Sequence, residues 1–184
     1  MRLFIAITFD DAVKDRLAEM QEKLHGGTLH ANFTEYENLH MTLHFFGERF
    51  DGRLPAIKKI MDGITEPAFP IQIQGVGCFR RDRGGDIWWV GVRDPKCMNR
   101  LHSNLCEGIV RADLYHDYER QDFKFHPHIT LAREVLTESR FDSVVMNRGM
   151  KAISTRVEKI VLMNSERIDG KLVYTPVYEK SLGG

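Results

Sequence analysis

The sequence predicts a fold of mixed strands and helices, built from a unit that occurs twice. Apolar runs of strand length alternate along the chain with segments whose apolar residues recur at helical spacing. A strand, an amphipathic helix and a strand with the pattern His-x-Thr-Leu follow one another from Leu3 to Phe46, and again from Ile87 to Arg133. We expect two such βαβ-like units to be related by an approximate two-fold axis, which would bring the two His-containing strands face to face.

The elements of the first half are predicted from apolar periodicity and from residues that begin or end helices. Asp10 and Asp11 are candidate caps for the first helix, and Gly26 and Gly27 end it. The expected elements are a strand from Leu3 to Phe9, a helix with the core face Val13, Leu17, Met20 and Leu24, strands near Phe33 to Tyr36 and from Leu39 to Phe46, and a helix marked by Leu54, Ile57, Met61 and Ile64 with Pro55 in its first turn.

The second half is predicted in the same way, and it contains one polar stretch from His116 to Asp122 with no expected element. The expected elements are strands from Phe69 to Cys78 and Asp86 to Val92, a helix with the core face Met98, Leu101, Leu105 and Ile109, the second His-containing strand from Phe125 to Arg133, a weaker helix from Thr137 to Asn147, and a hairpin of Val157 to Asn164 and Lys171 to Tyr178 around Asp169-Gly170.

The size and charge of the chain favour one globular domain. With 184 residues and 42% hydrophobic content, it can bury a sizeable core, and we expect a single domain over residues 1–184 made of two closely packed lobes. The 26 basic and 26 acidic side chains cancel. This balance argues against a protein that coats nucleic acid through charge alone, but a small or terminal nucleotide group is still a possible ligand.

Cysteine usage and the N-terminal sequence predict a cytoplasmic protein. Cys78, Cys97 and Cys106 are odd in number and lack C-x-x-C spacing, which supports neither a disulfide framework nor a zinc site. The N-terminal segment MRLFIAITFDD has no signal-peptide pattern, and no apolar stretch approaches the length of a membrane span. We therefore expect no membrane association.

The strongest motif is a four-residue pattern that occurs twice, as His40-Met41-Thr42-Leu43 and as His128-Ile129-Thr130-Leu131. In an extended strand side chains alternate between faces, so each His and the Thr two positions later project to one side, and the apolar residues to the other. If the two strands lie side by side, two imidazoles and two hydroxyls converge. Such a group is suited to acid-base chemistry on a phosphodiester.

These motifs and their surroundings resemble the 2H phosphoesterase superfamily, and within it the RNA 2',3'-cyclic phosphodiesterases, also called 2'-5' RNA ligase-like proteins. The matching segments extend over nearly the whole chain and are MRLFIAI, ENLHMTLHFFGE, IWWVGV, FHPHITLAR and NSERIDGKLVYTPVYEKSL. The departures are small. Phe46 stands where that family often has Leu, and His44 is an additional His within the first motif.

The resemblance implies a bilobal α+β fold in which two antiparallel β-sheets flank a central cleft, with helices on the outside. It implies a metal-independent hydrolase without a cofactor that opens a ribose 2',3'-cyclic phosphate to a 2'-phosphomonoester. By analogy with the family, His40 is the general acid at the 3'-oxygen and His128 is the general base. Thr42 and Thr130 would donate hydrogen bonds to the nonbridging phosphate oxygens. The expected partners are RNA ends or small nucleotides carrying the cyclic phosphate, bound by a monomer with no obligate protein partner.

Other residues have competing interpretations. Arg133 falls three positions after Thr130, so it either reaches the phosphate or a second nucleotide or is a solvated charge. The turn containing Arg80, Arg81 and Arg83 could form a basic lip for an RNA end, but a soluble charged turn is the favoured interpretation. Similarly, Phe46, Trp88 and Trp89 could stack on a base, but most of them are expected in the core.

Three alternative functions follow from the same residues. Eight histidines, with the pairs His40/His44 and His126/His128, suggest a metallohydrolase. Positions four apart on a strand are about 13 Å apart at roughly 3.3 Å per residue, so the first pair cannot share an ion, and the second pair lacks a carboxylate at ligand spacing. A non-catalytic nucleotide-binding module would not need an acid-base pair. Ligation of a cyclic phosphate to a 5'-hydroxyl is the nearest alternative, because the same displacement would use the same residues.

Overall fold

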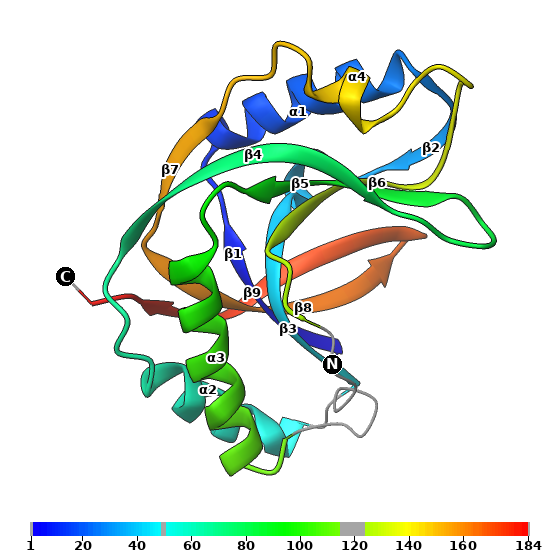
Figure 1. The fold of residues 1–184 in the computed structure, drawn as a ribbon. Coiled ribbons are helices and arrows are strands. Elements are labelled where there is room, and N and C mark those ends of the chain that lie inside the picture. Colours follow the sequence, from blue (N-terminus) through cyan, green and yellow to red (C-terminus); the bar gives the residue numbers. More distant parts are fainter. Residues whose placement is uncertain (1, 49–50, 115–123, 184) are drawn as a thin grey trace.

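The fold consists of one strongly curved sheet with helices at two ends of the molecule (Figure 1). The computed structural model describes residues 2–48, 51–114 and 124–183. The elements are β1 (Arg2–Thr8), α1 (Asp11–His25), β2 (Thr28–Phe33), η1 (Tyr36–Asn38), β3 (His40–Glu48), η2 (Asp51–Arg53), α2 (Leu54–Asp62), β4 (Phe69–Phe79), β5 (Asp86–Val92), α3 (Lys96–Arg111), β6 (His128–Thr137), α4 (Ser143–Asn147), β7 (Ile153–Val157), β8 (Lys159–Ile168) and β9 (Lys171–Ser181).

The described strands form a single sheet in the order β7-β4-β5-β6-β3-β1-β8-β9, with β2 paired to β6. All of these pairs are antiparallel. The α+β class is therefore confirmed. The two expected sheets are joined into one, because β3 and β6 meet at a single residue pair, Met41 with Ile129. Duplication of the two halves stays a prediction.

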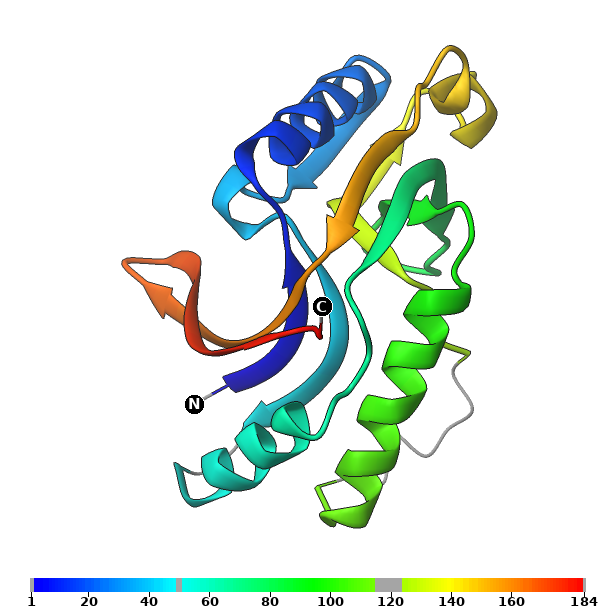
Figure 2. The same cartoon turned by 90° about the vertical axis from the view of Figure 1, so that its left-hand side faces the viewer.

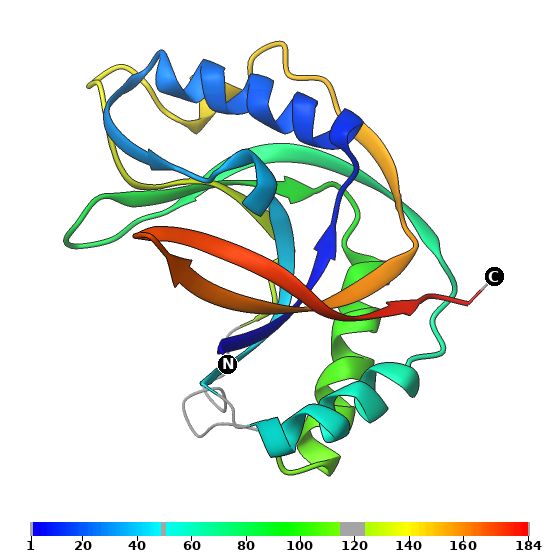
Figure 3. The same ribbon diagram turned by 180° about the vertical axis from the view of Figure 1, so that it is seen from behind.

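The helices cover the two ends of the sheet. Figure 1 shows α1 and α4 at one end and α2 and α3 at the other, and Figure 2 shows β1 and β3 between the β8–β9 hairpin and the β4–β5 strands. The β8–β9 hairpin crosses β1 and β3 in the view from behind (Figure 3). Each helix of the described residues falls short of the length and apolar character that crossing a membrane requires.

Helix α1 forms where the sequence predicts it. The side chain of Asp10 accepts a hydrogen bond of 2.9 Å from the Val13 N–H, which satisfies one of the unpaired donors of the first turn. The apolar residues spaced three or four apart are buried against the sheet, namely Val13, Leu17, Met20 and Leu24. Helix α3 buries its predicted face in the same way, through Met98, Leu101, Leu105 and Ile109.

Strand β1 is buried on both faces. One face contributes to the main apolar cluster, which contains residues from both halves of the chain. The other face contributes Phe4 and Ala6 to a second, small cluster with Val161 and Met163 of β8. Tyr174 of β9 packs against this second cluster. The second cluster supports the side of the sheet that carries His40, since Phe4 contacts that ring.

Several predicted boundaries are wrong. The strand expected near Phe33 to Tyr36 lies earlier, at Thr28–Phe33, and a 3-10 turn follows it. Among the described strands, β2 pairs with β6 alone. Its apolar residues Leu29, Ala31 and Phe33 do alternate, but Leu29 is 72% exposed, so the alternation does not mark a buried face. The second His-containing strand begins at His128 and continues to Thr137, so the helix expected from Thr137 shortens to Ser143–Asn147, capped by Asp142.

Strand β7 was not predicted from the sequence. The first strand of the final hairpin was predicted to start at Val157, but it starts at Lys159. Strand β7 is only five residues long and pairs with β4 alone among the described strands. The polar stretch from His116 to Asp122 lies outside the described residues.

Candidate active site

The two His-x-Thr strands lie side by side, as the repeated motif predicts. Met41 of β3 is paired with Ile129 of β6, and both side chains are fully buried in the main core. Because side chains alternate along a strand, the residues on either side of this pair project to the opposite face. That face carries His40, Thr42, His128 and Thr130, and we call it the histidine face.

The register of this pair interleaves the two motifs. In an antiparallel ladder with Met41 opposite Ile129, His40 lies across from Thr130 and Thr42 lies across from His128. Each imidazole is therefore beside the hydroxyl of the other motif as well as near its own. The charge of His128 acts on His40, which is consistent with this proximity. Neither of two cavities elsewhere on the protein, of about 440 Å³ and 380 Å³, is lined by any of these four residues.

Both imidazoles are held through Nδ1 by the backbone. His40 Nδ1 lies 2.6 Å from the carbonyl oxygen of Asn38, and His128 Nδ1 lies 2.7 Å from that of His126. A carbonyl oxygen can only accept, so Nδ1 carries the proton and donates it in both rings. The Nε2 atoms therefore remain available to other partners, and the Nε2 of His40 lies 2.9 Å from the Thr42 hydroxyl.

Both histidines have lowered pKa values. Burial lowers the pKa of His40; the hydrogen bond to Asn38 opposes this, and the charges of Arg133 and His128 lower the pKa further. Burial also lowers the pKa of His128, opposed by the hydrogen bond to His126 and reinforced by the charges of His126 and Arg133. No carboxylate contributes to either shift. Both rings therefore favour the neutral form before an anion binds.

The charge of Arg133 acts on both histidines, and a bulge in β6 explains why its sequence spacing left its role open. Trp89 pairs with Thr130, but Trp88 pairs with Ala132, so β6 contains one more residue than β5 at this point. The extra residue reverses the alternation, and Arg133 follows two consecutive buried positions. Its charge lowers the pKa of His40, of His128 and of Tyr174. Among the described residues, no carboxylate forms an ion pair with Arg133.

Strand β3 has a bulge at the corresponding place. Ile5 pairs with His44, but Ala6 pairs with Thr42, which leaves Leu43 as the additional residue. As a result His44 is buried, with its ring 4.6 Å from that of Phe46, while Phe45 is exposed. His40 and His44 therefore lie on different faces of the strand, which excludes this pair as a shared metal site.

Aromatic side chains that the sequence analysis did not single out stand beside each imidazole. Phe4 and Tyr174 lie 5.0 Å and 5.2 Å from His40, between ring centroids. Phe79 and the predicted Trp89 lie 5.1 Å and 6.1 Å from His128. Phe4 was assigned only to an apolar strand and Tyr174 only to a hairpin, because neither position has a local signal that points to a site.

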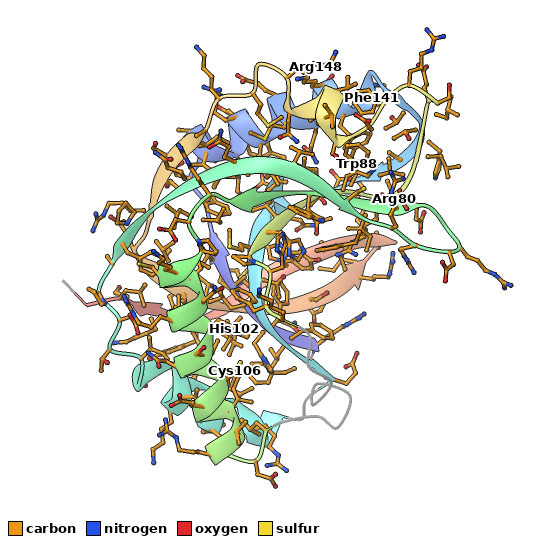
Figure 4. All side chains as sticks on the ribbon, viewed as in Figure 1. Arg80, Trp88, His102, Cys106, Phe141 and Arg148 are labelled. Carbon is orange, nitrogen blue, oxygen red and sulfur yellow. The ribbon has the colours of Figure 1, made fainter. Side chains whose placement is uncertain are left out.

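The other predicted residues lie in the core or in the turn between β4 and β5. Phe46 and Trp88 are core residues, and Trp88 lies near Phe141 under α4, with 5.8 Å between ring centroids (Figure 4). Arg80 forms an ion pair of 2.7 Å with Asp86. The remaining two arginines of that turn, Arg81 and Arg83, are exposed. Within residues 2–48, 51–114 and 124–183, no group of three or more His, Cys, Asp and Glu side chains is arranged to hold a metal ion.

Known proteins are similar to this chain in both sequence and fold. Residues 9–169 match the model of the 2'-5' RNA ligase superfamily. A Methanothermobacter thermautotrophicus protein named RNA 2',3'-cyclic phosphodiesterase is 28% identical over 181 residues, covering 95% of each chain. An Archaeoglobus fulgidus protein with the same name is 30% identical over 133 residues, covering 72% of each chain.

Solved structures with a similar fold also come from proteins similar to this chain in sequence. The apo crystal structure of Escherichia coli LigT matches with a TM-score of 0.78 and 25% identity, covering 100% of this chain and 98% of LigT. A crystal structure of a Thermus thermophilus protein also has a TM-score of 0.78, with 27% identity and coverage of 100% and 99%. The match to the family model extends over most of the chain. The protein therefore belongs to the 2'-5' RNA ligase superfamily, as its two His-x-Thr motifs indicate.

Proposed function

We propose that this protein is an RNA 2',3'-cyclic phosphodiesterase that hydrolyses the cyclic phosphate to a 2'-phosphomonoester without a metal ion. The observation that carries the proposal is the common face of β3 and β6, where two imidazoles and two hydroxyls lie together with Arg133 nearby. The names of the relatives support the substrate class. The histidine mechanism is supported by the orientation of the rings through their Nδ1 atoms.

Hydrolysis requires proton transfer on two opposite sides of phosphorus. His128 Nε2 accepts a proton from water as the water oxygen bonds to phosphorus. The bond from phosphorus to the ribose 3'-oxygen breaks, and His40 Nε2–H donates its proton to that oxygen. The product carries a 2'-phosphate and a 3'-hydroxyl, with His40 neutral and His128 protonated, and solvent returns both to their starting states.

The remaining polar groups of the site suit the charge that develops on the phosphate. Thr42 and Thr130 can donate hydroxyl hydrogen bonds to the nonbridging oxygens, and Arg133 supplies a cation that no described carboxylate neutralises. The bound anion also raises the pKa of His40, because an opposite charge favours the imidazolium form. Binding therefore prepares the general acid that the free protein lacks near neutral pH.

The test is an assay of nucleoside 2',3'-cyclic monophosphates in EDTA with identification of the product isomer. We expect turnover to a 2'-phosphate, and a loss of about 100-fold or more in His40→Ala and in His128→Ala. The matched control is His30→Ala, an exposed histidine on β2, which should retain activity. Near-normal turnover by His128→Ala would remove the mechanism, and a 3'-phosphate product would exchange the two histidine roles.

A further inference from the structure

Phe45 occupies the position in the first motif that Arg133 occupies in the second. Each lies three residues after the Thr of its motif, and each follows a register shift that reverses the alternation of its strand. Phe45 pairs with Phe4 of β1, so the two side chains project to the same face. Phe4 contacts the His40 ring at 5.0 Å between centroids. The equivalent positions of the two motif strands therefore carry different side chains. Arg133 supplies a cation after the second motif, and Phe45 supplies an aromatic ring after the first.

The Phe45 ring is unusually accessible. It is 37% exposed, and Phe79 at 37% is the other aromatic residue among the exposed large hydrophobic side chains of the described chain. Phe79 already lies against His128, 5.1 Å between centroids, whereas no histidine contact accounts for Phe45 among the described residues. An exposed aromatic face beside a polar site is a suitable surface for stacking of a nucleobase.

Arg2 adds a cation to this surface. Its guanidinium carbon lies 5.1 Å from the centroid of the Phe45 ring, within cation-π range. No described carboxylate forms an ion pair with Arg2. Its charge also lowers the pKa of Tyr174, whose ring is 5.2 Å from His40 and perpendicular to it. Tyr174 therefore contacts the His40 ring and is also within the electrostatic influence of Arg2.

The proposed mechanism predicts which part of the substrate lies on the His40 side of the phosphorus. Water attacks from the side of His128, so the leaving 3'-oxygen and its ribose lie on the side of His40. A nucleotide that precedes the terminal ribose is attached through its 5'-oxygen, and we place it on the same side of the phosphorus. It would meet the surface formed by Arg2 and Phe45.

We propose that Arg2 and Phe45 form a second nucleotide subsite, which selects an RNA end over a single cyclic nucleotide. The Arg2 guanidinium binds the phosphate on the 5'-oxygen of the terminal nucleotide, and the Phe45 ring stacks on the base of the nucleotide before it. This subsite depends on the proposed function, because it is defined relative to the cyclic phosphate at the two histidines.

Three substrates separate the two contacts. Cytidine 2',3'-cyclic phosphate lacks both groups, its 5'-phosphorylated form adds the phosphate, and a dinucleotide ending in the cyclic phosphate adds the second base. Arg2→Ala should lower kcat/KM about tenfold for the second and third substrates relative to the first. Phe45→Leu should lower it about tenfold for the dinucleotide alone. Arg140→Ala, an exposed arginine between β6 and α4, is the matched control and should alter none of these ratios.

The outcomes distinguish this subsite from the proposed function. If the unaltered protein hydrolyses all three substrates and each variant lowers kcat/KM by the same factor for all three, the subsite does not exist. If the unaltered protein hydrolyses none of them, the proposed function itself fails. Circular dichroism melting of both variants, together with an Arg2→Lys variant that restores part of the phosphate preference, separates loss of the contact from loss of folding.

Discussion

His40 and His128 are oriented by backbone carbonyl groups instead of carboxylates. The acceptor is in each case the carbonyl two residues earlier, on Asn38 or on His126. A carboxylate partner would raise the pKa of an imidazole, whereas here burial is the largest influence and lowers it. In the proposed mechanism, the substrate anion therefore has to raise the pKa of the general acid.

This arrangement predicts the position of the pH optimum. The free protein has both histidine pKa values below the ordinary value of about 6.5. Because one ring must be protonated and the other neutral, kcat/KM should follow a bell-shaped curve with its maximum below about pH 6.5. A pH series with cytidine 2',3'-cyclic phosphate measures it. A maximum above about pH 7.5 would contradict the shifts.

His126 is predicted to tune the general base through its charge. Its ring centroid lies 6.1 Å from that of His128, and its charge lowers the pKa of His128. Arg133 is the other cation that acts on His128. Replacement by His126→Gln removes this electrostatic effect but retains the backbone carbonyl that holds Nδ1, so the pKa of His128 should rise. A histidine NMR titration gives the value, and an unchanged or lower pKa would refute the coupling.

Arg133 should have two opposite effects when it is removed. Its charge lowers the pKa of both histidines, so Arg133→Gln should raise both values in an NMR titration. In the proposed mechanism the same change also removes a cation that stabilises the charged phosphate, so kcat/KM should fall about 100-fold. Unchanged pKa values in this variant would contradict the electrostatic effect of Arg133 on the two histidines.

For individual residues, the sequence predicts the four motif residues but not their aromatic neighbours. His40, Thr42, His128 and Thr130 are predicted because alternation and repetition identify a common face. Arg133 could not be assigned, because a bulge depends on the pairing partner and leaves no pattern in the strand's own sequence. Phe4 and Tyr174 reach His40 from separate strands, which no local motif encodes.

At the scale of elements, the bulges of β6 determine where Arg133 points. A second register shift lies between Ala132 and Val135 and so includes Arg133 itself, and Glu134 adopts a positive φ of 55° there. Gly85 of the β4–β5 turn packs against this backbone. A Cβ added to Gly85 would lie 2.5 Å from the carbonyl carbon of Glu134, so only glycine permits this approach.

The glycines of that turn provide a matched pair of variants. Gly84 and Gly85 have similar positive φ values of 79° and 77°, but a Cβ on Gly84 meets nothing within 4 Å. Gly84→Ala should lower the free energy of unfolding by about 1 kcal/mol, because alanine is strained at a positive φ. Gly85→Ala should cost roughly 1 to 3 kcal/mol more and should also lower kcat/KM, because the contact displaces the backbone next to Arg133. Urea denaturation and the hydrolysis assay measure both, and equal behaviour of the two variants would argue against this role.

The elements that sequence predicts best are those with one clearly apolar face. The faces of α1 and α3 are buried as predicted. Strand β2 was misplaced although Leu29, Ala31 and Phe33 alternate, because none of its side chains is fully buried, and β7 was missed because it is short. These elements owe their positions to pairing with distant strands rather than to their own periodicity.

At the scale of the whole molecule, one residue pair joins the two halves of the sheet. The mixed fold and the adjacency of the two motif strands could be predicted from the repeat. The continuity of the sheet could not, because it depends on a single pairing of Met41 with Ile129 between residues far apart in sequence. That pair is fully buried and holds the two motifs in register.

The stability of the folded protein should fall as the pH drops. The pKa values of His40, His128 and His102 are lowered in the folded state, chiefly by burial in each case. The folded protein therefore binds fewer protons than the unfolded chain below about pH 6.5, and protonation favours unfolding. Urea denaturation should give a lower free energy of unfolding at about pH 5.5 than at about pH 7.5. Constant stability over this interval would contradict the lowered values.

The central claim is that His40 and His128 act on one anion from opposite sides. The most direct test is a titration of the protein with adenosine 2'-monophosphate, followed through the imidazole NMR signals of both residues. We predict that both rings respond with a single dissociation constant, that both pKa values rise in the complex, and that Arg133→Gln weakens both responses together. A response from only one ring, or two unrelated dissociation constants, would contradict the account.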